Sequence, residues 1–476
     1  MVRAVRALRP DRLLGHLRHA MRRRRLARAA HRRDPEAAAR HFAAFVTPLP
    51  GSPTAPAAAR HRILVLQKVG LNEDISAAFA GQTGVALLRG PRHAVKALAH
   101  AFLPPHLDDN NYVTTSPADD AAKAAYREFL CAFWPALQRH VRLDAAVSGN
   151  FCYYAERELA GALERLGTPF VVLHKENMKS PGRQAFFERV YRERRGPFHG
   201  RRILVYNEIE RQTQIRAGVA APDRIRVVGM PRLDRVHARR RALAGQAAPP
   251  SGPGPVLFFS FAPKVGLPFL PRKRHPASGE RYAETFADTR SDLSWQHLWE
   301  TSHRAVLALA RAHPSIPVHI KVKDSYRETG AIQALLGDAG PLPANVRLVV
   351  GGDPLDLIFD AAVVCGFNST ALLEAVAAGK PVVTPAFAEA AAPDQRDYIV
   401  DLSAGVTVVD SPEALQERLA TAARQPRTAP LELPEPSRRL LEDWLGNADG
   451  LAGRRAAEAI LSEIDATHGG HEHADA

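Results

Sequence analysis

The stretch Ala361–Pro385, AAVVCGFNSTALLEAVAAGKPVVTP, constrains the fold of this chain more than any other part of the sequence. It predicts a buried strand over Ala361–Cys365, a tight turn that begins at Gly366, and a helix that opens at Ser369. A second strand follows over Val382–Thr384. A strand, a helix and another strand within so few residues are typical of a parallel sheet covered by helices. The chain is therefore predicted to be an α/β protein.

The start of the predicted helix has the residue types of an anion site. Asn368, Ser369 and Thr370 all favour the N-cap, and an apolar helical face follows them. In open α/β folds such a helix start lies at the carboxyl edge of the sheet, where ligands bind. Its free N–H groups and positive dipole end favour a phosphate, and Glu374 follows one turn later with a carboxylate suited to ribose hydroxyls. A plain capped helix has the same pattern, so both interpretations stay open at this point.

The same residues form a pattern that resembles a known family. Gly366-x-x-Ser-Thr-x-x-x-Glu374, with a Gly-Lys-Pro turn at 379–381, resembles the donor-nucleotide motif of GT-B glycosyltransferases. The pattern is most similar to that of surface and capsular polysaccharide transferases and the related glycerophosphotransferases. The resemblance implies two Rossmann-like domains that face a cleft. It also implies that Ser369 and Thr370 meet the donor diphosphate and that Glu374 meets the ribose.

Length and composition bound the domain count and the class of protein. The 476 residues are enough for two or three domains that each bury a core. A hydrophobic content of 46% with 24% charged residues is ordinary for a soluble globular protein. Cys131, Cys152 and Cys365 lie in apolar or aromatic surroundings without metal-ligand spacing, which predicts buried thiols in a reducing compartment. No apolar run is long enough to span a membrane and no secretory signal is evident, so a cytoplasmic location is expected.

The positive charge is concentrated at the N-terminus. Residues 1–34 hold twelve arginines against Asp11 and Asp34, a net charge of +10 out of +14 for the whole chain. Leucines among the arginines predict a basic amphipathic helix, which can lie on an anionic membrane surface. Membrane contact, on the inner face of the cytoplasmic membrane, is the favoured interpretation, and a solvated helix follows closely. A nucleic-acid-binding tail would carry a similar charge but is not expected.

Two linkers rich in proline, alanine and glycine divide the chain, Thr47–Ala59 and Arg239–Pro255. The expected organisation is a basic helical extension with its linker (1–59), a Rossmann-like acceptor domain (60–238), a second linker (239–255), a Rossmann-like donor domain (256–466) and a disordered tail (467–476). Further strands are predicted over His61–Leu66, Val85–Leu88, Ala145–Ser148, Pro169–Leu173, Arg202–Tyr206, Ile225–Val228, Val256–Ser260, Val318–Lys323, Val346–Val349 and Val406–Val409. Leu440–Ile464 is predicted to be helical, and in GT-B folds the terminal helix often crosses back to the first domain.

Polar residues follow a buried strand of the first domain. His174, Lys175 and Glu176 come directly after the predicted strand Pro169–Leu173, at the sheet edge where ligands bind. Asp74 ends the loop after the domain's first strand. A polar loop with a helix cap is the alternative interpretation of these residues.

Further candidates for the acceptor side of the cleft lie later in the first domain. Asn207 and Glu208 follow another strand, Arg211 comes one turn later, and Arg232 lies in the segment RIRVVGMPRLD. These segments resemble the end of the acceptor domain in surface-polysaccharide transferases, where the second one leads into the hinge between the domains.

Three lysines of the second domain are candidates for the donor phosphates. Lys264 lies in the loop after the domain's first strand. Lys321 and Lys323 lie on one face of a predicted strand because strand side chains alternate. One or both of these two can reach the phosphates, and a solvated edge strand is the alternative.

The favoured function is a GT-B transferase that moves a sugar, or a polyol phosphate, from a nucleotide-activated donor to a surface polysaccharide or lipid-linked acceptor. The chemistry needs a base for the acceptor hydroxyl and positive charge for the leaving diphosphate. Glu176, His174 and Asp74 are the candidate bases, in that order. No Asp-x-Asp motif is evident, so no metal and no cofactor is implied. A nucleotide-sugar epimerase of the same fold and a non-catalytic assembly partner are the alternatives.

Overall fold

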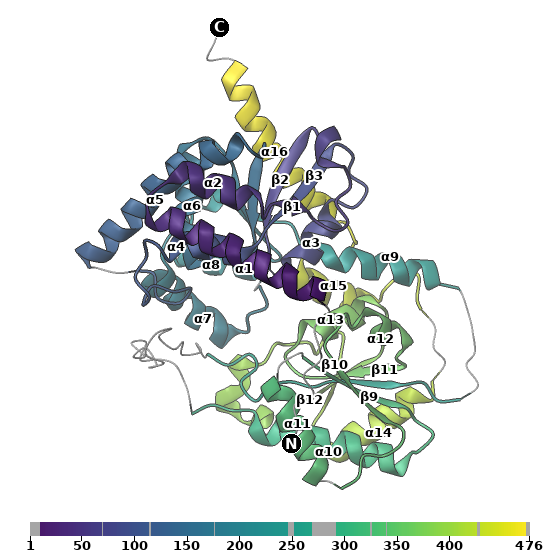
Figure 1. Cartoon of the computed structure of the whole chain (residues 1–476). Coiled ribbons are helices and arrows are strands. Elements are labelled where there is room, and N and C mark those ends of the chain that lie inside the picture. Colours follow the sequence, from purple (N-terminus) through teal and green to yellow (C-terminus); the bar gives the residue numbers. More distant parts are fainter. Residues whose placement is uncertain are drawn as a thin grey trace.

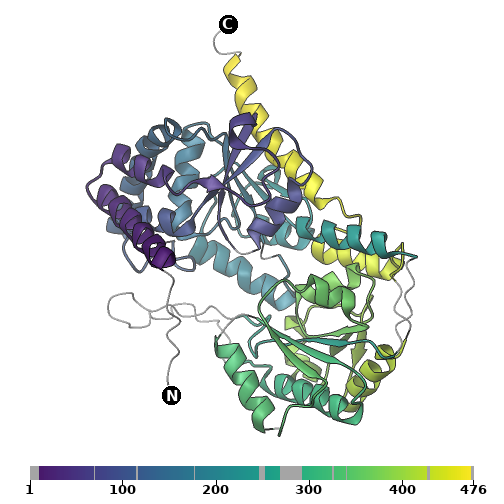
Figure 2. The ribbon, with the colours of Figure 1, turned by 45° about the vertical axis from the view of Figure 1, so that its right-hand side comes forward.

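The fold consists of two domains, each built on a parallel sheet (Figure 1). The computed structural model describes residues 10–68, 70–113, 116–175, 177–245, 252–268, 292–323, 326–338, 340–425 and 429–472. Helices cover the faces of both sheets, and the two domains lie one above the other (Figure 2). The predicted α/β class with two Rossmann-like domains is confirmed.

The sheet of the first domain has seven strands in the order β1-β3-β2-β4-β5-β6-β7. Its strands are β1 (Thr47–Pro48), β2 (His61–Leu66), β3 (Val85–Gly90), β4 (Ala145–Ser148), β5 (Phe170–Leu173), β6 (Arg202–Val205) and β7 (Ile225–Val227). Its helices are α3 (Leu71–Ala78), α4 (Arg92–Ala99), α5 (Pro117–Gln138), α6 (Tyr154–Arg165), α7 (Pro181–Val190) and α8 (Glu208–Arg216). All neighbouring strands are parallel except β1, which pairs antiparallel with β3.

The sheet of the second domain is parallel throughout, with the order β10-β9-β8-β11-β12-β13. Its strands are β8 (Val256–Phe259), β9 (Val318–Val322), β10 (Val346–Val350), β11 (Val363–Cys365), β12 (Val382–Pro385) and β13 (Thr407–Val409). Its helices are α10 (Gln296–Ala312), α11 (Tyr326–Asp338), α12 (Leu355–Asp360), α13 (Thr370–Ala377) and α14 (Pro412–Ala423). This is the doubly wound order, in which the direction of strand addition reverses between β8 and β11, where ligands of such folds bind.

The two domains exchange helices. The helix α9 (Asp234–Leu243) follows the first sheet in sequence, but its Val236 packs in a core with α13 and α15 (Glu435–Leu445) of the second domain. Conversely, α16 (Ala452–Glu472) ends the chain and buries Ile460 and Ile464 against the first sheet. Figure 2 shows α16 running from the second domain along the first. The expected crossing of the terminal helix is confirmed, and α16 belongs to the first domain in packing.

Two glycines lie where the crossing segments meet. Gly229 and Gly446 both have a positive φ, +86° and +57°. A Cβ at Gly229 would overlap the carbonyl oxygen of Gly446, and one at Gly446 would overlap that of Tyr206. The adjacent Asn447 is fully buried and donates to the carbonyl of Met230 at 2.9 Å. In the hinge between the domains the backbone segments therefore pack directly on one another. A side chain at Gly229 or Gly446 would force these segments apart.

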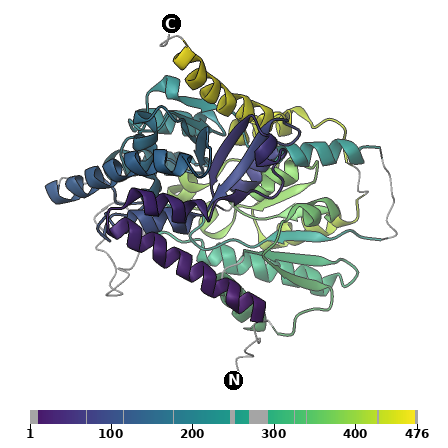
Figure 3. The ribbon, with the colours of Figure 1, turned by 45° about the horizontal axis from the view of Figure 1, so that its top comes forward.

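The N-terminal extension is part of the first domain, which corrects the expected division of residues 1–59 into a separate helical extension and linker. The helices α1 (Pro10–His31) and α2 (Pro35–Ala43) lie against α4 and α5 (Figure 3), with Leu26 and Phe42 buried in the domain core. The expected linker contributes β1 and a buried Leu49, and Ser52 Oγ accepts a hydrogen bond from the Leu87 amide at 2.9 Å. Apolar residues on one helix face dock wherever an apolar surface is available, and here the surface is the protein's own.

Two other expected boundaries are corrected. The helix α9 extends to Leu243, into the expected second linker, because Arg240 is buried and donates to carbonyl oxygens of the second domain, among them that of Ala377 at 2.9 Å. The helix α16 extends to Glu472, into the expected disordered tail, since a helix that is anchored by packing propagates at little cost. In the part of the chain that the structure describes, no helix combines the length and apolarity needed to span a membrane.

Candidate active site

A cleft with a volume of about 500 Å³ lies between the two domains. The first domain contributes the segment after β5 and the start of α7, and the second contributes the loops after β8, β9 and β11. The described residues that line this interdomain cleft are Lys175, Asn177, Met178, Lys179, Arg183, Phe187, Ser260, Phe261, Ala262, Lys264, Val265, Lys323, Phe367, Asn368, Ser369 and Thr370. The cleft is thus at the carboxyl edge of both sheets, as expected for a ligand site.

The start of α13 forms one wall of the interdomain cleft. Ser369 is its N-cap and accepts a hydrogen bond from the Ala371 amide at 3.3 Å, as the sequence predicts. Asn368 has a φ of +47°, and its side-chain amide donates to the Tyr398 carbonyl at 3.0 Å and accepts from the Val400 amide at 2.9 Å. Asn368 therefore holds the turn in the conformation that directs Ser369 and Thr370 toward the cleft.

Gly366 acts through close packing at the end of β11. A Cβ at this position would lie 3.2 Å from the carbonyl oxygen of Phe259 and 3.2 Å from a methyl carbon of Leu372. A side chain here would push the turn away from β8. A side chain at Gly366 would therefore crowd the backbone at the point where the strand order reverses, and Gly366 is absent from the residues that line the cleft.

Basic side chains from both domains converge on the cleft. Lys264 and Lys323 come from the second domain, and Lys175, Lys179 and Arg183 come from the first. Among the described lining residues there is no carboxylate and no histidine. With the N-terminus of α13 on the same wall, this lining favours a ligand with several negative charges, such as a diphosphate.

His174 is not a cleft residue, which corrects its assignment as a candidate base. It is fully buried, with Nε2 at 3.1 Å from Oε1 of Glu210, and Glu210 also pairs with Lys179. Burial alone would raise the pKa of Glu210, but the charges of Lys179 and His174 outweigh it and lower that pKa to about 2. The cluster holds Lys179 at the wall of the cleft and leaves His174 without access to a substrate.

Asp74 is likewise buried, and its assignment as a candidate base is corrected. It accepts hydrogen bonds from the Tyr206 hydroxyl at 2.6 Å and from Nη1 of Arg232 at 2.9 Å. Burial raises the pKa of Asp74 and the charge of Arg232 opposes that effect. Arg232 also lies 3.8 Å from Oε1 of Glu374, so one guanidinium joins a carboxylate of each domain.

Glu374 lies on α13 one turn after Thr370, as the sequence predicts, but it faces the hinge side. The residue is 9% exposed, and Arg232 is its ion-pair partner. Burial raises the pKa of Glu374, and the nearby arginines Arg232 and Arg235 counteract the rise. Its carboxylate is therefore placed beside the cleft wall and held by a residue of the hinge.

Four other expected site residues lie away from the cleft lining. Lys321 is buried and donates to the carbonyl of Gly351, whereas Lys323, just after β9, lines the cleft. Asn207 is the N-cap of α8 and donates to the Trp444 carbonyl at 2.6 Å, which joins the domains. Glu208 pairs with Arg211 at 2.8 Å on the outer surface of α8. Glu176 lies outside the described residues, between the lining residues Lys175 and Asn177.

Several functional candidates were missed by reasoning from the sequence. Lys179 and Arg183 lie six and ten residues beyond the end of β5 at Leu173, and only the course of the chain into α7 returns them to the cleft. The pairing of Lys179 with Glu210 joins residues that no short motif links. The basic residues around 175–183 were the available signal, since three of them occur within nine residues.

A second polar cluster was also missed, at the carboxyl end of β4 where the first sheet reverses its order. Glu156 of α6 is 3% exposed, accepts a hydrogen bond from Ser148 Oγ and has Arg92 Nε 3.9 Å away. Burial raises the pKa of Glu156 to about 7, despite the opposing effects of Ser148 and Arg92. A carboxyl group in such a position titrates near neutral pH. In the described part of the chain, no group of three or more His, Cys, Asp or Glu side chains has a metal-binding arrangement.

Comparisons with known proteins find likenesses only among solved structures. No family model and no curated protein matches the chain. UDP-GlcNAc 2-epimerase from Neisseria meningitidis bound to UDP-GlcNAc is 11% identical, with a TM-score of 0.45 over 84% of this chain and 100% of that chain. The wall teichoic acid polymerase TagF is 9% identical, with a TM-score of 0.45 over 96% and 99%. A UDP-forming α,α-trehalose-phosphate synthase from Burkholderia xenovorans is 11% identical, with a TM-score of 0.44 over 86% and 99%. At these low scores the likenesses carry no argument about activity, and the strand orders of the two sheets define the fold.

Proposed function

We propose that this chain is a GT-B type glycosyltransferase that moves a sugar, or a polyol phosphate, from a nucleotide-activated donor to a polysaccharide acceptor. The observation that carries the proposal is the lining of the interdomain cleft. A helix N-terminus at the reversal point of the second sheet faces basic side chains from both domains. A nucleoside diphosphate has the charge and the shape for such a wall.

The second domain holds the donor in this proposal. The first amides of α13 and the hydroxyls of Ser369 and Thr370 bind the diphosphate, while Lys264 and Lys323 neutralise the charge that develops on the leaving group. Glu374 takes the ribose hydroxyls. Its buried position beside Arg232 keeps it in place without a substrate.

The first domain positions the acceptor. Glu176 is the proposed base, because its neighbours Lys175 and Asn177 both line the cleft and the other two candidates are buried in ion pairs. The base removes the proton from the acceptor hydroxyl as that oxygen attacks the donor. With a sugar donor the bond between the sugar and the nucleoside diphosphate breaks, and with a polyol phosphate donor the phosphoanhydride bond breaks and a nucleoside monophosphate leaves. Lys175 and Arg183 supply positive charge on the acceptor side for an anionic group.

The test is to incubate the full-length protein with a panel of nucleotide-activated sugars and polyols and to measure the nucleotide released. Ser369→Ala should weaken nucleotide binding about tenfold or more, since it removes the serine hydroxyl that donates a hydrogen bond to the charged diphosphate. Ser411→Ala is the matched control, because Ser411 is the N-cap of α14 and bonds the Ala414 amide at 3.2 Å outside the cleft lining. Conversion of the donor without nucleotide release would show an epimerase instead, and no binding of any nucleotide would overturn the proposal.

The exposed arginines of α1 suggest where such an enzyme meets its acceptor. Arg22, Arg23, Arg24 and Arg25 are all exposed on a helix whose Leu26 is buried in the domain core. We propose that this basic face contacts an anionic membrane surface through charge. Leu26 is buried in the protein core, so the proposed contact with the membrane depends on the arginines and not on insertion of Leu26.

A further inference from the structure

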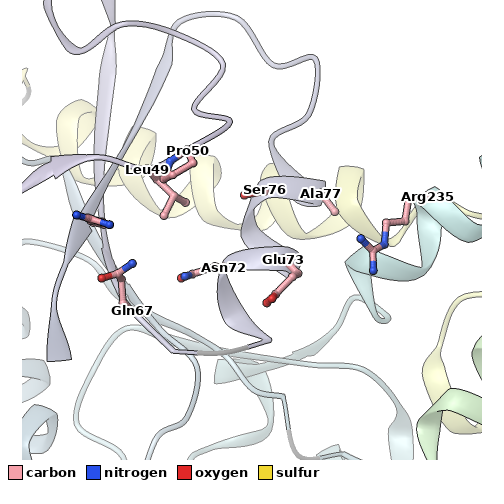
Figure 4. A pocket seen from close by; sticks show the side chains of 9 residues that line it. Leu49, Pro50, Gln67, Asn72, Glu73, Ser76, Ala77 and Arg235 are labelled. Carbon is pink, nitrogen blue, oxygen red and sulfur yellow. The ribbon is translucent and has the colours of Figure 1, made fainter. Parts of the chain in front are cut away.

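A second pocket, with a volume of about 490 Å³, is lined by residues other than those of the interdomain cleft (Figure 4). Its walls come from the segment after β1, the end of β2, the helix α3, the strand β3 and the start of α9. A volume of this size is ordinary for a small-molecule site. Nothing in the proposed transfer reaction uses it, so its occupant has to be inferred from its lining.

The lining differs in chemistry from that of the interdomain cleft. Gln67, Asn72 and Ser76 each carry both a donor and an acceptor, and Glu73 adds an acceptor. Figure 4 shows Asn72, Glu73 and Ser76 on α3, across from Gln67. A ligand whose hydroxyl groups both donate and accept hydrogen bonds is matched by such a mixture. A phosphate has no donor to offer the Glu73 carboxylate and would be repelled by its charge.

The charges of the pocket are balanced. Arg89 and Arg235 line it with Glu73, and Arg235 forms a bidentate pair with Asp353 of the second domain, at 2.7 and 3.2 Å. Arg89 Nε donates to Thr47 Oγ1 at 2.8 Å. Glu73 and the Asp353 partner of Arg235 thus offset the charges of the two arginines, and this balance favours an uncharged ligand.

An apolar wall completes the pocket. Leu49 and Pro50 lie on one side of it and Ala77 lies on α3 (Figure 4). Pyranose rings have C–H groups on their faces and hydroxyls around their edges, so one apolar wall among polar groups suits a sugar. The structure holds this wall firmly, since Leu49 is 3% exposed and its amide bonds the Leu87 carbonyl at 2.8 Å.

Asn72 has unused hydrogen-bonding capacity. Its Oδ1 is buried without a hydrogen-bond partner among the described residues, although the residue lines the pocket. A buried amide oxygen without a partner destabilises the fold by about 1–3 kcal/mol. Rotation of the amide toward a bound hydroxyl would remove that cost, which is an arrangement expected of a ligand-binding side chain.

The pocket is separated from the interdomain cleft by the first turn of α3. A Cβ at Gly70, which precedes that helix, would lie 3.7 Å from the side chain of Lys175, and Lys175 lines the cleft. Asn72, two residues after Gly70, lines the pocket, so the start of α3 lies between the two sites. An oligosaccharide that reacts in the cleft can extend past the start of α3 into the pocket.

We propose that this pocket binds an uncharged sugar residue of the acceptor glycan, distal to the residue that reacts. That the bound glycan is the acceptor rests on the proposed function, whereas the binding of a neutral sugar does not. Because Arg235 joins the pocket wall to Asp353 of the second domain, the arrangement of the two domains shapes this subsite.

The test measures binding of the full-length protein to an array of neutral oligosaccharides, with hits confirmed by ligand-observed NMR. Asn72→Leu and Arg89→Leu should each weaken binding at least tenfold, while Arg226→Leu leaves it unchanged. Arg226 is the matched control, being exposed on β7 at the opposite edge of the same sheet. Asn72→Leu should also keep or raise the melting temperature, because it removes a buried oxygen without a partner.

Two results would overturn the inference. One is that the wild-type protein binds no neutral glycan more strongly than the Asn72→Leu variant does. The other is that a glycan binds equally to wild type and both pocket variants. Nucleotide affinity measured on the same preparations separates this inference from the proposed function. Glycan binding without nucleotide binding would leave the sugar site standing and would refute the transferase.

Discussion

Glu374 shows how one residue can serve both binding and structure. Its carboxylate lies near the start of α13 and pairs with Arg232 at 3.8 Å. We predict that Glu374→Gln weakens nucleotide binding by about ten- to a hundredfold, because a hydrogen bond to a charged group contributes about 1.5–3 kcal/mol. Calorimetric titration checks this, with Glu463→Gln as the control. Glu463 is similarly buried and pairs with Arg202, but it lies on α16. Equal nucleotide affinities for wild type and Glu374→Gln would contradict the assignment.

Glu156 makes stability depend on pH near neutrality. Burial raises its pKa to about 7 from an ordinary 4.5, so the folded state binds this proton more tightly than the unfolded state does. Its contribution therefore favours folding below about pH 4.5 and is lost as pH rises to about 7, by about 3 kcal/mol in total.

We predict that Glu156→Gln, which resembles the protonated form, gains stability relative to wild type as pH rises from 4.5 to 7. Urea unfolding at a series of pH values measures the difference. A constant difference between the two proteins over that range would show that Glu156 titrates normally.

At the scale of elements, the hinge depends on two glycines. A side chain at Gly229 or Gly446 would overlap backbone oxygen atoms of the crossing segments. We predict that Gly229→Ala and Gly446→Ala each destabilise the protein by several kcal/mol, because strain at a positive φ adds to the overlap. Gly218→Ala is the control, since Gly218 also has a positive φ, +70°, but faces open space. Melting temperatures of the three variants measure the loss of stability. Equal losses at all three positions would show that strain at a positive φ, and not overlap with the backbone, causes the destabilisation.

Because α1 packs on the first domain, binding of the basic N-terminus to a membrane is better tested by substitution of its arginines than by truncation. Deleting residues 1–33 would remove Leu26 from the core, so a truncated protein would lose stability together with charge. Replacing Arg23, Arg24 and Arg25 by Gln keeps the packing. We predict that it weakens binding to anionic vesicles at least tenfold, since each basic residue near the surface contributes about 1 kcal/mol.

The control for this experiment removes the same net charge elsewhere. Arg304, Arg347 and Arg418 are exposed on the second domain. Their replacement by Gln should leave vesicle binding unchanged in a sedimentation assay at moderate salt. Equal losses in both triple variants would show that only net charge matters, and no loss in either would identify α1 as a solvated helix.

For the whole molecule, the sequence predicts what is local and misses what joins distant segments. The parallel strands were predictable because buried strands are continuous apolar runs between turns, as in Val256–Ser260. The N-cap at Ser369 was predictable because serine before an apolar helical face is a local signal of a helix start. The docking of α1 was not, because an apolar helix face does not reveal whether it covers a membrane or a domain. The pairing of Asp74 with Arg232 joins residues 158 positions apart in the first domain, and the contact of Arg232 with Glu374 exists only once both domains have formed.

The exchange of helices makes the two domains depend on each other. The first sheet is covered in part by α16, from the end of the chain, and the core around α13 includes residues of α9. Removal of either helix would expose apolar surface of the domain it covers. The chain is therefore divided into two sheets but not into two independently stable units.

We predict that the full-length protein unfolds in a single calorimetric transition. Ile460 is fully buried where α16 meets the first sheet, and Ile460→Ala should cost about 2–5 kcal/mol through lost burial and a residual cavity. Because the domains are coupled through α16 and the hinge, this variant should shift the whole transition to lower temperature without splitting it. Two separate transitions, with Ile460→Ala moving only one, would show that each domain folds by itself.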